Sequence, residues 1–225
     1  MPSSTSIGKG FDRLAFIYDL VVWLVFGNKI SNLKKTFLGP LTKANNAIII
    51  GGGSGKILKY AIESDIATSF VYAELSDRMI EKAKSRITPS DLTRIEFCDD
   101  FEQKLQKNKF DYIILPFVLD CYRNRDVKAM LRQFSVALSE NGSILFFDFN
   151  LSKEDGFEPK QWKIAFIKLL YTFFRLTTDI PAKKLPSFGR HFSEAGYYRG
   201  RATLISKGWI QAIEWKRENR IRATE

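Results

Sequence analysis

Residues 47–55 read Ala-Ile-Ile-Ile-Gly-Gly-Gly-Ser-Gly, and this stretch decides the fold class. Its apolar first half, with three β-branched isoleucines, predicts a buried parallel strand. Gly51, Gly53 and Gly55 then allow a turn whose backbone can touch a ligand, because no Cβ stands in the way. Helical spacing over 56–62 completes a strand–turn–helix unit. Such a unit is the first crossover of a doubly wound sheet, where nucleotide cofactors bind.

Two well-known glycine patterns do not match this turn. A phosphate-binding P-loop requires glycine where Ile50 stands and a hydroxyl residue where Ile57 stands. The dinucleotide fingerprint G-x-G-x-x-G requires glycine at the position of Lys56. The pattern present is G-x-G-x-G, which identifies a cofactor only together with residues farther along the chain.

Three further strands are predicted, over 70–73, 94–98 and 110–114. The first of them ends on Glu74, about 20 residues after the glycine turn, where a carboxylate can accept both ribose hydroxyls. Ser76 follows as the expected N-cap of the next helix. Because open α/β sheets bind ligands at the carboxyl ends of their strands, the functional residues are expected along this edge.

This ordered series resembles the class I S-adenosylmethionine-dependent methyltransferases, most closely the small-molecule branch that includes the ubiquinone and menaquinone biosynthesis enzymes. The likeness begins with Phe-Asp-x-x-Ala-x-x-Tyr-Asp at 11–19 and reaches the approach to a fifth strand at 137–145. The chain departs from the family pattern at Ile49, where an acidic residue usually helps to place the amino group of the cofactor. The segments that carry the resemblance between these ends are 50–55, Glu74-Leu75-Ser76-x-x-Met79, Cys98-Asp99-Asp100-Phe101 and 110–114.

The resemblance implies an α/β fold with a doubly wound, mostly parallel seven-stranded sheet, the Rossmann-like methyltransferase fold, closed by an antiparallel hairpin. The hairpin has its own signal, because Ser-Lys-Gly at 206–208 separates two strand-like runs. One methyltransferase domain is expected over 1–225. Its expected parts are N-terminal capping helices (1–45), a cofactor-binding core (46–150), a lid insertion with a helix (151–199) and the closing hairpin (200–217).

The resemblance also implies how the cofactor, S-adenosyl-L-methionine, would be held. The glycine turn would pass along its methionine and ribose, and Glu74 would hold the ribose hydroxyls. Asp100, or alternatively Asp99, would accept from the adenine amino group. The cofactor-binding set comprises Gly51, Gly52, Gly53 and Gly55 of the turn, Glu74, Asp99 and Asp100, the adenine-enclosing Leu75, Met79 and Phe101, and Leu115 and Pro116 beside the methyl group.

Asp120, Tyr18 and His191 are the candidates for catalysis. The resemblance places Asp120 and its neighbour Tyr122, just past the fourth strand, and Tyr18, in the opening helix, so that they face the substrate. His191 is the only histidine. A histidine base suits an O-methyltransferase because its pKa lies near neutrality, and a place on a helix surface is the alternative. The Leu-Pro-Phe of 115–117 is not the polar-Pro-Pro-aromatic sequence of adenine or glutamine methyltransferases, which argues against methylation of nucleic-acid bases.

Composition predicts a reduced, cytoplasmic protein. A chain of 225 residues suffices for one α/β domain with a substantial core. Its two cysteines, Cys98 and Cys121, stand on separate predicted elements, so we expect neither a disulfide framework nor a metal site. The apolar run 14–26 is interrupted by Asp19, is too short to span a bilayer and is not followed by a cleavage site.

Positive charge is concentrated in the last third of the chain. The net charge is +10, and residues 151–225 hold 15 Lys and Arg against 8 Asp and Glu. Apolar residues recur at three- and four-residue steps over 160–175, which predicts an amphipathic helix, and the resemblance implies that it is a lid. Peripheral contact with an anionic membrane and a solvated basic face are the alternatives. Dispersed basic residues without a recognition motif argue against nucleic acid as a partner.

Two functions are consistent with these observations. The favoured one is an S-adenosylmethionine-dependent methyltransferase acting on a small, apolar or aromatic acceptor such as a quinone precursor, a phenol or a lipid-like molecule. The alternative is a non-catalytic S-adenosylmethionine-binding or scaffold protein of the same fold, since a fold alone does not determine function. Ile49, in place of the usual acid, keeps this alternative open.

Overall fold

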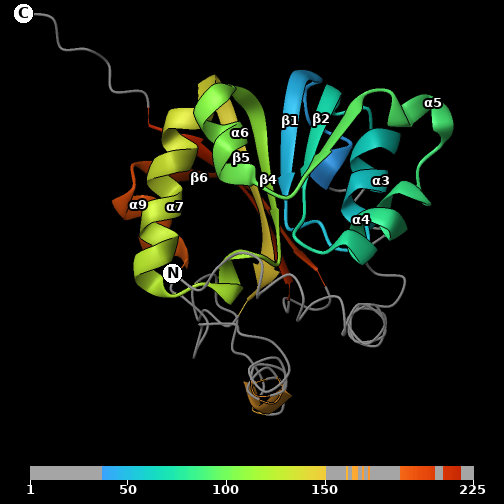
Figure 1. The fold of residues 1–225 in the computed structure, drawn as a ribbon. Helices are drawn as coiled ribbons and strands as arrows, with labels where there is room; N and C mark the ends of the chain where they lie inside the picture. The colour runs from blue at the N-terminus through green and yellow to red at the C-terminus, as the bar shows by residue number, and fades with distance from the viewer. Residues whose placement is uncertain are drawn as a thin grey trace, which may run out of the picture.

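The computed structural model describes residues 37–150, 188–205 and 210–218, together with a few helical residues between 161 and 172 (Figure 1). These residues form one seven-stranded sheet with the strand order β3-β2-β1-β4-β5-β7-β6. None of the helices in the described part is both long and apolar enough to cross a membrane.

Several expectations fall on residues outside the described ones. They are the capping helices with Tyr18, most of the lid insertion with its possible lipid contact, and the turn of the closing hairpin. These expectations stay predictions, as does the cytoplasmic location.

The sheet is parallel except for one strand. β7 runs antiparallel to both of its neighbours, β5 and β6, while the pairs β1–β2, β1–β4, β2–β3 and β4–β5 are parallel. The predicted fold class, a mostly parallel seven-stranded sheet with an antiparallel closing pair, is confirmed. The strands are β1 (Ala44–Ile50), β2 (Ala67–Ala73), β3 (Ile95–Cys98), β4 (Phe110–Pro116), β5 (Leu138–Phe149), β6 (Tyr197–Ile205) and β7 (Ile210–Arg217).

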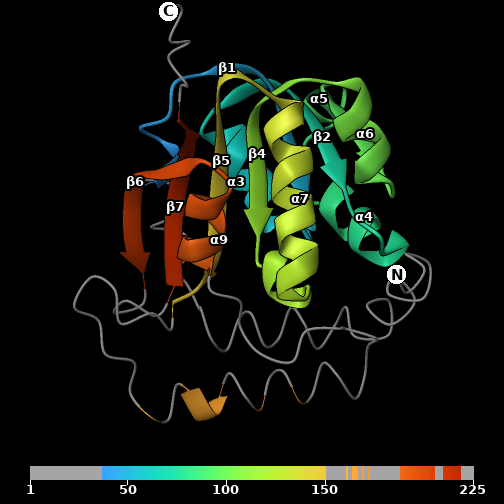
Figure 2. The same ribbon diagram turned by 90° about the vertical axis from the view of Figure 1, so that its left-hand side faces the viewer.

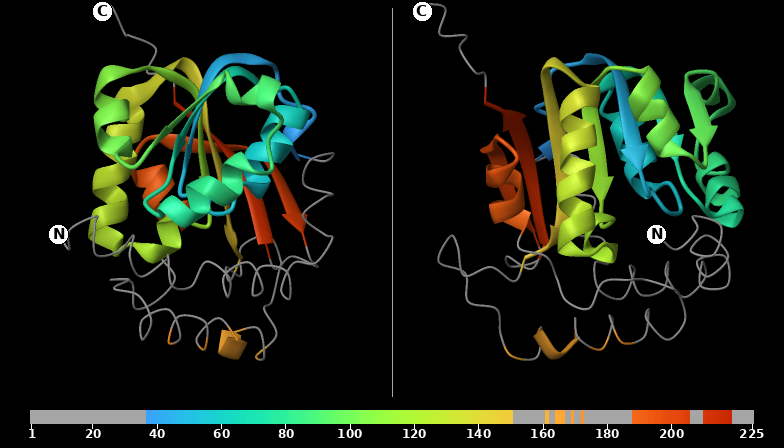
Figure 3. Two further views of the ribbon diagram at one scale, coloured as in Figure 1. Left: turned by 45° about the vertical axis from the view of Figure 1, so that its right-hand side comes forward. Right: turned by 60° about the vertical axis from the view of Figure 1, so that its left-hand side comes forward.

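Helices cover both faces of the sheet (Figure 3). α3 and α4 lie over one face, and α7 and α9 lie together over the other (Figures 1 and 2). The short η3 connects β4 to α7 at the carboxyl ends of the parallel strands. The helices are α3 (Lys56–Glu63), α4 (Asp77–Lys84), α5 (Pro89–Leu92), α6 (Phe101–Lys107), η3 (Leu119–Cys121), α7 (Asn124–Ala137) and α9 (Phe188–Glu194).

The isoleucines of β1 alternate between two hydrophobic clusters, one on each face. Ile49 packs in the cluster that contains the apolar side of α3, and Ile48 and Ile50 pack in the cluster that contains α7. Burying each side chain in this way contributes about 1.5–3 kcal/mol. Because both faces of β1 are covered over 47–50, this part of the strand is continuously apolar, as predicted for a buried parallel strand, whereas Asn45 and Asn46 stand at its less buried start.

β2 and β4, like β1, extend beyond the apolar patterns that predict them. β2 begins at Ala67, which pairs with Ala44 of β1, and the hydroxyls of Thr68 and Ser69 donate to the backbone carbonyls of Ala44 and Asn45. β4 continues to Pro116, beyond the last residue pair of the β1–β4 ladder, because its end still pairs with β5. The second extension places the residues after Pro116 directly at the carboxyl edge of the sheet.

Candidate functional site

The glycine turn after β1 has a backbone that only glycine adopts without strain. Gly51, Gly53 and Gly55 have φ values of 69°, 60° and 82°, in the left-handed region. Space is also lacking, since a Cβ on Gly51 would lie 2.7 Å from Cγ2 of Val118. The turn is therefore in contact with the segment that follows β4.

Tyr72 of β2 contacts the glycine turn and fixes its shape. Its side chain is fully buried, and its hydroxyl donates a 2.7 Å hydrogen bond to the backbone carbonyl of Gly53. A Cβ on Gly52 would lie 2.4 Å from Cε2 of Tyr72. Gly52 is therefore required because Tyr72 leaves no room for a side chain, and not because of its backbone angles.

Glu74 lies beside the glycine turn, as the sequence predicts. Its Oε2 accepts from the backbone N–H of Gly53 at 2.9 Å, and its Oε1 accepts from that of Ser76 at 3.2 Å. These two bonds fix the orientation of the carboxylate, and a carboxylate oxygen accepts up to two hydrogen bonds. Ser76 is the predicted N-cap of α4, because its Oγ accepts from the N–H of Met79.

The residues predicted to surround the adenine lie at the starts of α4 and α6. Met79 is buried, whereas Leu75 and Phe101 are half-buried. Asp100 caps α6, with its Oδ1 accepting from the N–H of Gln103 at 3.0 Å, and Asp99 is exposed. The capping role of Asp100 explains its position in the fold, and its adenine contact stays a prediction.

The chain turns sharply where β4 ends. Leu115 and Pro116 are buried at the end of the strand, and Phe117 takes a left-handed φ of 52°, which is unusual for a bulky residue. Two contacts hold it, a 2.8 Å hydrogen bond from its N–H to the carbonyl of Phe147 and an edge-on ring contact with Phe149. Backbone strain of this kind clusters at functional sites.

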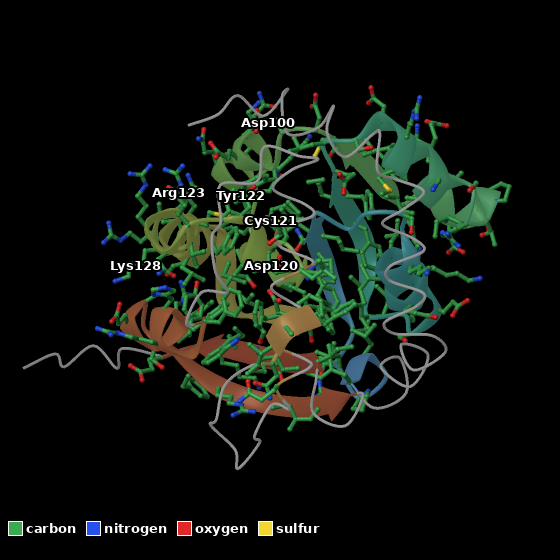
Figure 4. All side chains as sticks on the ribbon, turned by 90° about the horizontal axis from the view of Figure 1, so that it is seen from below. Asp100, Asp120, Cys121, Tyr122, Arg123 and Lys128 are labelled. Carbon is green, nitrogen blue, oxygen red and sulfur yellow. The ribbon has the colours of Figure 1, made fainter. Side chains whose placement is uncertain are left out.

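After this turn, Asp120, Cys121 and Tyr122 lie near the middle of the carboxyl edge, and Asp100 lies farther out (Figure 4). The Sγ of Cys121 is 3.5 Å from Oδ1 of Asp120. Burial raises the pKa of the Cys121 thiol, and the charges of Asp120, Asp148 and Glu74 raise it further. Burial likewise raises the pKa of Tyr122. Asp120, Asp148 and Glu74 therefore lie close enough to Cys121 to oppose ionisation of its thiol.

Asp148, at the end of β5, is a residue that sequence reasoning missed. It is fully buried, and burial followed by the charge of Asp120 raises its pKa well above the ordinary range. Its Oδ1 accepts from the N–H of Phe149. The only sequence signal was a single carboxylate within the apolar run Leu-Phe-Phe-Asp-Phe of 145–149.

His191 lies in α9, against the start of α7. Only 7% of its surface is exposed, and its Nε2 is 2.9 Å from Oδ1 of Asn124. Burial, and then the charge of Lys128, lowers its pKa. The predicted helix is present, and the imidazole is hydrogen-bonded to Asn124 rather than to an acidic residue of the carboxyl edge. Tyr18 lies outside the described residues.

Residues 48–144 match the family model described as a methyltransferase domain. Comparison with curated proteins found no match. A methyltransferase domain implies S-adenosylmethionine as methyl donor, so the match confirms the predicted cofactor and enzyme class for this domain. The particular branch, with ubiquinone and menaquinone biosynthesis, stays a prediction.

Solved structures share the fold. The mitomycin 7-O-methyltransferase is similar with a TM-score of 0.68 and 17% identity, over 92% of this chain and 60% of that one. An O-methyltransferase from neocarzinostatin biosynthesis was solved in complex with S-adenosyl-L-homocysteine and 1,4-dihydroxy-2-naphthoic acid. It is similar with a TM-score of 0.64 and 18% sequence identity, over 90% of this chain and 56% of that one. Magnesium protoporphyrin IX methyltransferase from Synechocystis PCC 6803, with bound S-adenosylhomocysteine, is similar with a TM-score of 0.65 and 13% sequence identity, over 96% of this chain and 100% of that one.

This chain thus spans about 60% of the length of the first of these enzymes. At such identities the likeness shows a common fold, that of the class I methyltransferases, and leaves the acceptor open.

Proposed function

We propose that this chain, in which residues 48–144 form a methyltransferase domain, transfers a methyl group from S-adenosylmethionine to a hydroxyl group of a small, apolar or aromatic acceptor. The observation that carries the proposal is the position of Glu74, which both the glycine turn and the start of α4 hold by backbone N–H groups. A quinone precursor, a phenol or a lipid-like molecule is the acceptor class we favour, and the O-methyltransferase of similar fold from neocarzinostatin biosynthesis was solved in complex with 1,4-dihydroxy-2-naphthoic acid.

The residues of the edge fit this cofactor. The glycine turn provides a backbone surface without side chains, because Cβ atoms at Gly51 and Gly52 would collide with Val118 and Tyr72. Glu74 supplies the acceptor for ribose hydroxyls. The carboxylates gathered near Cys121 provide a negative environment that complements a positively charged sulfonium. We call the glycine turn with Glu74 the cofactor half of the site, and η3 with the end of β5 the acceptor half.

The bound cofactor would supply an activated methyl group, so the chain itself has three tasks: to orient the acceptor, to exclude water and to receive a proton. Buried aromatic residues around Phe117 and Phe149 provide an apolar environment near the end of β4. Such surroundings favour an apolar or aromatic acceptor over a highly charged one.

A non-catalytic binding protein is the second candidate, and one observation favours it. Ile49 is completely buried in the core, so no carboxylate from this position reaches the amino group of the cofactor. Cofactor affinity is the quantity that separates the candidates at the first step.

Isothermal titration of the protein with S-adenosylmethionine tests the proposal. We expect binding in the wild type and a 10- to 100-fold weaker binding in Glu74→Ala, because hydrogen bonds to a charged group contribute about 1.5–3 kcal/mol. Glu81→Ala, on the exposed side of α4, is the matched control and should bind as the wild type does. If the wild type binds no S-adenosylmethionine, the proposed function is wrong.

A screen of phenols, quinols and amines with labelled cofactor then identifies the acceptor. Transfer of label to a hydroxyl compound supports the enzyme. Binding without transfer to any class supports the non-catalytic candidate.

A further inference from the structure

The turn at Phe117 keeps a bulky side chain in a backbone conformation that it does not favour. Its φ of 52° lies in the left-handed region, which glycine adopts freely and an aromatic residue does not. The hydrogen bond that holds the turn, from the N–H of this residue to the carbonyl of Phe147, is open to every residue except proline. The hydrogen bond therefore explains the turn, whereas the phenyl ring must be explained by what it contacts.

The phenyl ring of Phe117 contacts the end of β5. Its centroid lies 5.5 Å from that of Phe149, and the ring planes meet at 65°, an edge-to-face arrangement that aromatic rings favour. The two residues differ in burial, since Phe149 is 5% exposed within the core, whereas Phe117 is only partly buried and packs against that core. Phe149 thus supports the ring from the inside, and part of Phe117 is accessible at the edge of the sheet.

The next residue along the chain places Phe117 beside the cofactor half. A Cβ on Gly51 would lie 2.7 Å from Cγ2 and 3.0 Å from Cβ of Val118, so the Val118 side chain packs on the glycine turn. Consecutive Cα atoms are about 3.8 Å apart, so Phe117 stands one residue from the backbone that would run along the cofactor. On its other side η3 begins, and Asp120 and Cys121 of η3 lie near the middle of the carboxyl edge (Figure 4).

We propose that Phe117 is a specificity-determining residue of the acceptor half, and that its ring contacts the planar ring of an aromatic hydroxyl compound. The inference rests on the proposed function and deepens it, because it selects phenols and quinols and leaves out saturated, lipid-like acceptors. A saturated molecule of the same size would gain only the burial of apolar surface at Phe117. An aromatic one would gain in addition a ring-to-ring contact of the kind that Phe149 already makes.

The test compares two probes with the same carbon skeleton and one hydroxyl group, 1-naphthol and decahydro-1-naphthol. Each is titrated calorimetrically into the complex of the protein with S-adenosylhomocysteine, whose sulfur carries no methyl group, so that only binding is measured. The compared quantity is the ratio of the two dissociation constants. We expect the wild type to bind 1-naphthol about 2- to 10-fold more tightly, the range that one aromatic pair contributes.

Three substitutions assign this preference to the ring. Phe117→Leu keeps an apolar side chain without the ring, so the two probes should bind about equally, while S-adenosylhomocysteine binds as it does to the wild type. Phe117→Tyr keeps the ring and should keep the preference. Phe188→Leu is the matched control, because it removes one ring of another pair, 4.8 Å from that of Phe146, in the core cluster on the opposite face of the sheet. It should also keep the preference.

A second variant serves if Phe117→Leu does not fold. Phe117→Gly removes the ring and adopts the left-handed φ without strain, so it should fold and lose the preference. A folded variant without the ring that still prefers 1-naphthol would overturn the proposed role. A loss of affinity for S-adenosylhomocysteine in Phe117→Leu would overturn it as well, because the ring would then belong to the cofactor half.

Failure of this inference is distinguishable from failure of the proposed function. A wild type that binds neither S-adenosylmethionine nor S-adenosylhomocysteine overturns the function. A wild type that binds both, and does not bind 1-naphthol more tightly than decahydro-1-naphthol, overturns only the specificity of Phe117 for an aromatic acceptor.

Discussion

The cofactor half and the acceptor half of the site are built from different kinds of neighbours. In the cofactor half, Glu74 reaches back 21 residues to Gly53, and Tyr72 reaches back 19, all within one strand–helix–strand unit. In the acceptor half, a short helix after β4 meets the end of β5, with the whole of α7 between them in sequence. The first half has a local sequence signature, and the second exists only once the sheet has formed.

This contrast indicates how rigid each half must be. The cofactor half depends on glycines with no room for a side chain, so single methyl groups should be costly there. The acceptor half contains buried carboxyl groups, so substitutions there should change how the stability of the protein depends on pH. Three predictions test that division.

The largest effect is expected at Gly55. Gly55→Ala combines a left-handed φ, which costs about 1–2 kcal/mol, with a Cβ placed 2.6 Å from Cα of Ala83, where overpacking costs a further 1–3 kcal/mol. Gly196→Ala is the matched control, because Gly196 has a φ of 80° and a Cβ added there would meet no atom within 4 Å. Urea unfolding of both variants gives the two free energies. Equal losses of unfolding free energy in the two variants would contradict the inference that the glycine turn has no room for a methyl group.

Asp148→Asn should change the pH dependence of stability. The pKa of Asp148 is raised in the folded chain, so this carboxyl stabilises the fold below its unfolded pKa, and the contribution is lost as pH rises through the folded pKa. Relative to the wild type, the variant should therefore gain up to about 1.4 kcal/mol of unfolding free energy per pH unit in that window. Glu140→Gln, exposed near the other end of β5, is the control, and parallel curves for wild type and Asp148→Asn would remove the electrostatic argument.

The smallest effect is expected at His191. His191→Gln should cost about 1 kcal/mol of stability, because it disturbs the hydrogen bond with Asn124. A double-mutant cycle with Asn124→Ala measures the pair directly. An interaction energy near zero would show that the hydrogen bond between His191 and Asn124 does not stabilise the fold.

Local sequence rules were sufficient to predict how the glycine turn and Glu74 are arranged, while their contact with the cofactor stays a prediction. The isoleucines of β1, the alternate glycines and the acid at the end of β2 each have a physical reason to stand at a fixed distance from the next. The same rules placed Ser76 as the N-cap of α4, which is confirmed. They underestimated β2, because Thr68 and Ser69 are polar and yet belong to the segment whose backbone pairs with β1, which an apolar pattern does not record.

The acceptor half was only partly predictable. Asp120 was named from the resemblance, but Asp148 was not, because its burial and its coupling to Asp120 depend on which strands become neighbours. The backbone conformation of Phe117 could not be predicted either, because contacts with β5 hold it in the left-handed region, which an aromatic residue does not itself favour. His191 was correctly placed on a helix, while its partner Asn124 is distant in sequence.

The hydrogen bond from the Tyr72 hydroxyl to Gly53 has a consequence for how ligand binding proceeds. A glycine-rich segment normally has high conformational entropy, and ordering it on binding would weaken affinity. Here the tyrosine, buried and anchored in the central sheet, already holds the segment in one shape, and Glu74 fixes it from the side. The turn is thus preorganised. Its conformational entropy is lost when the chain folds rather than when the ligand binds.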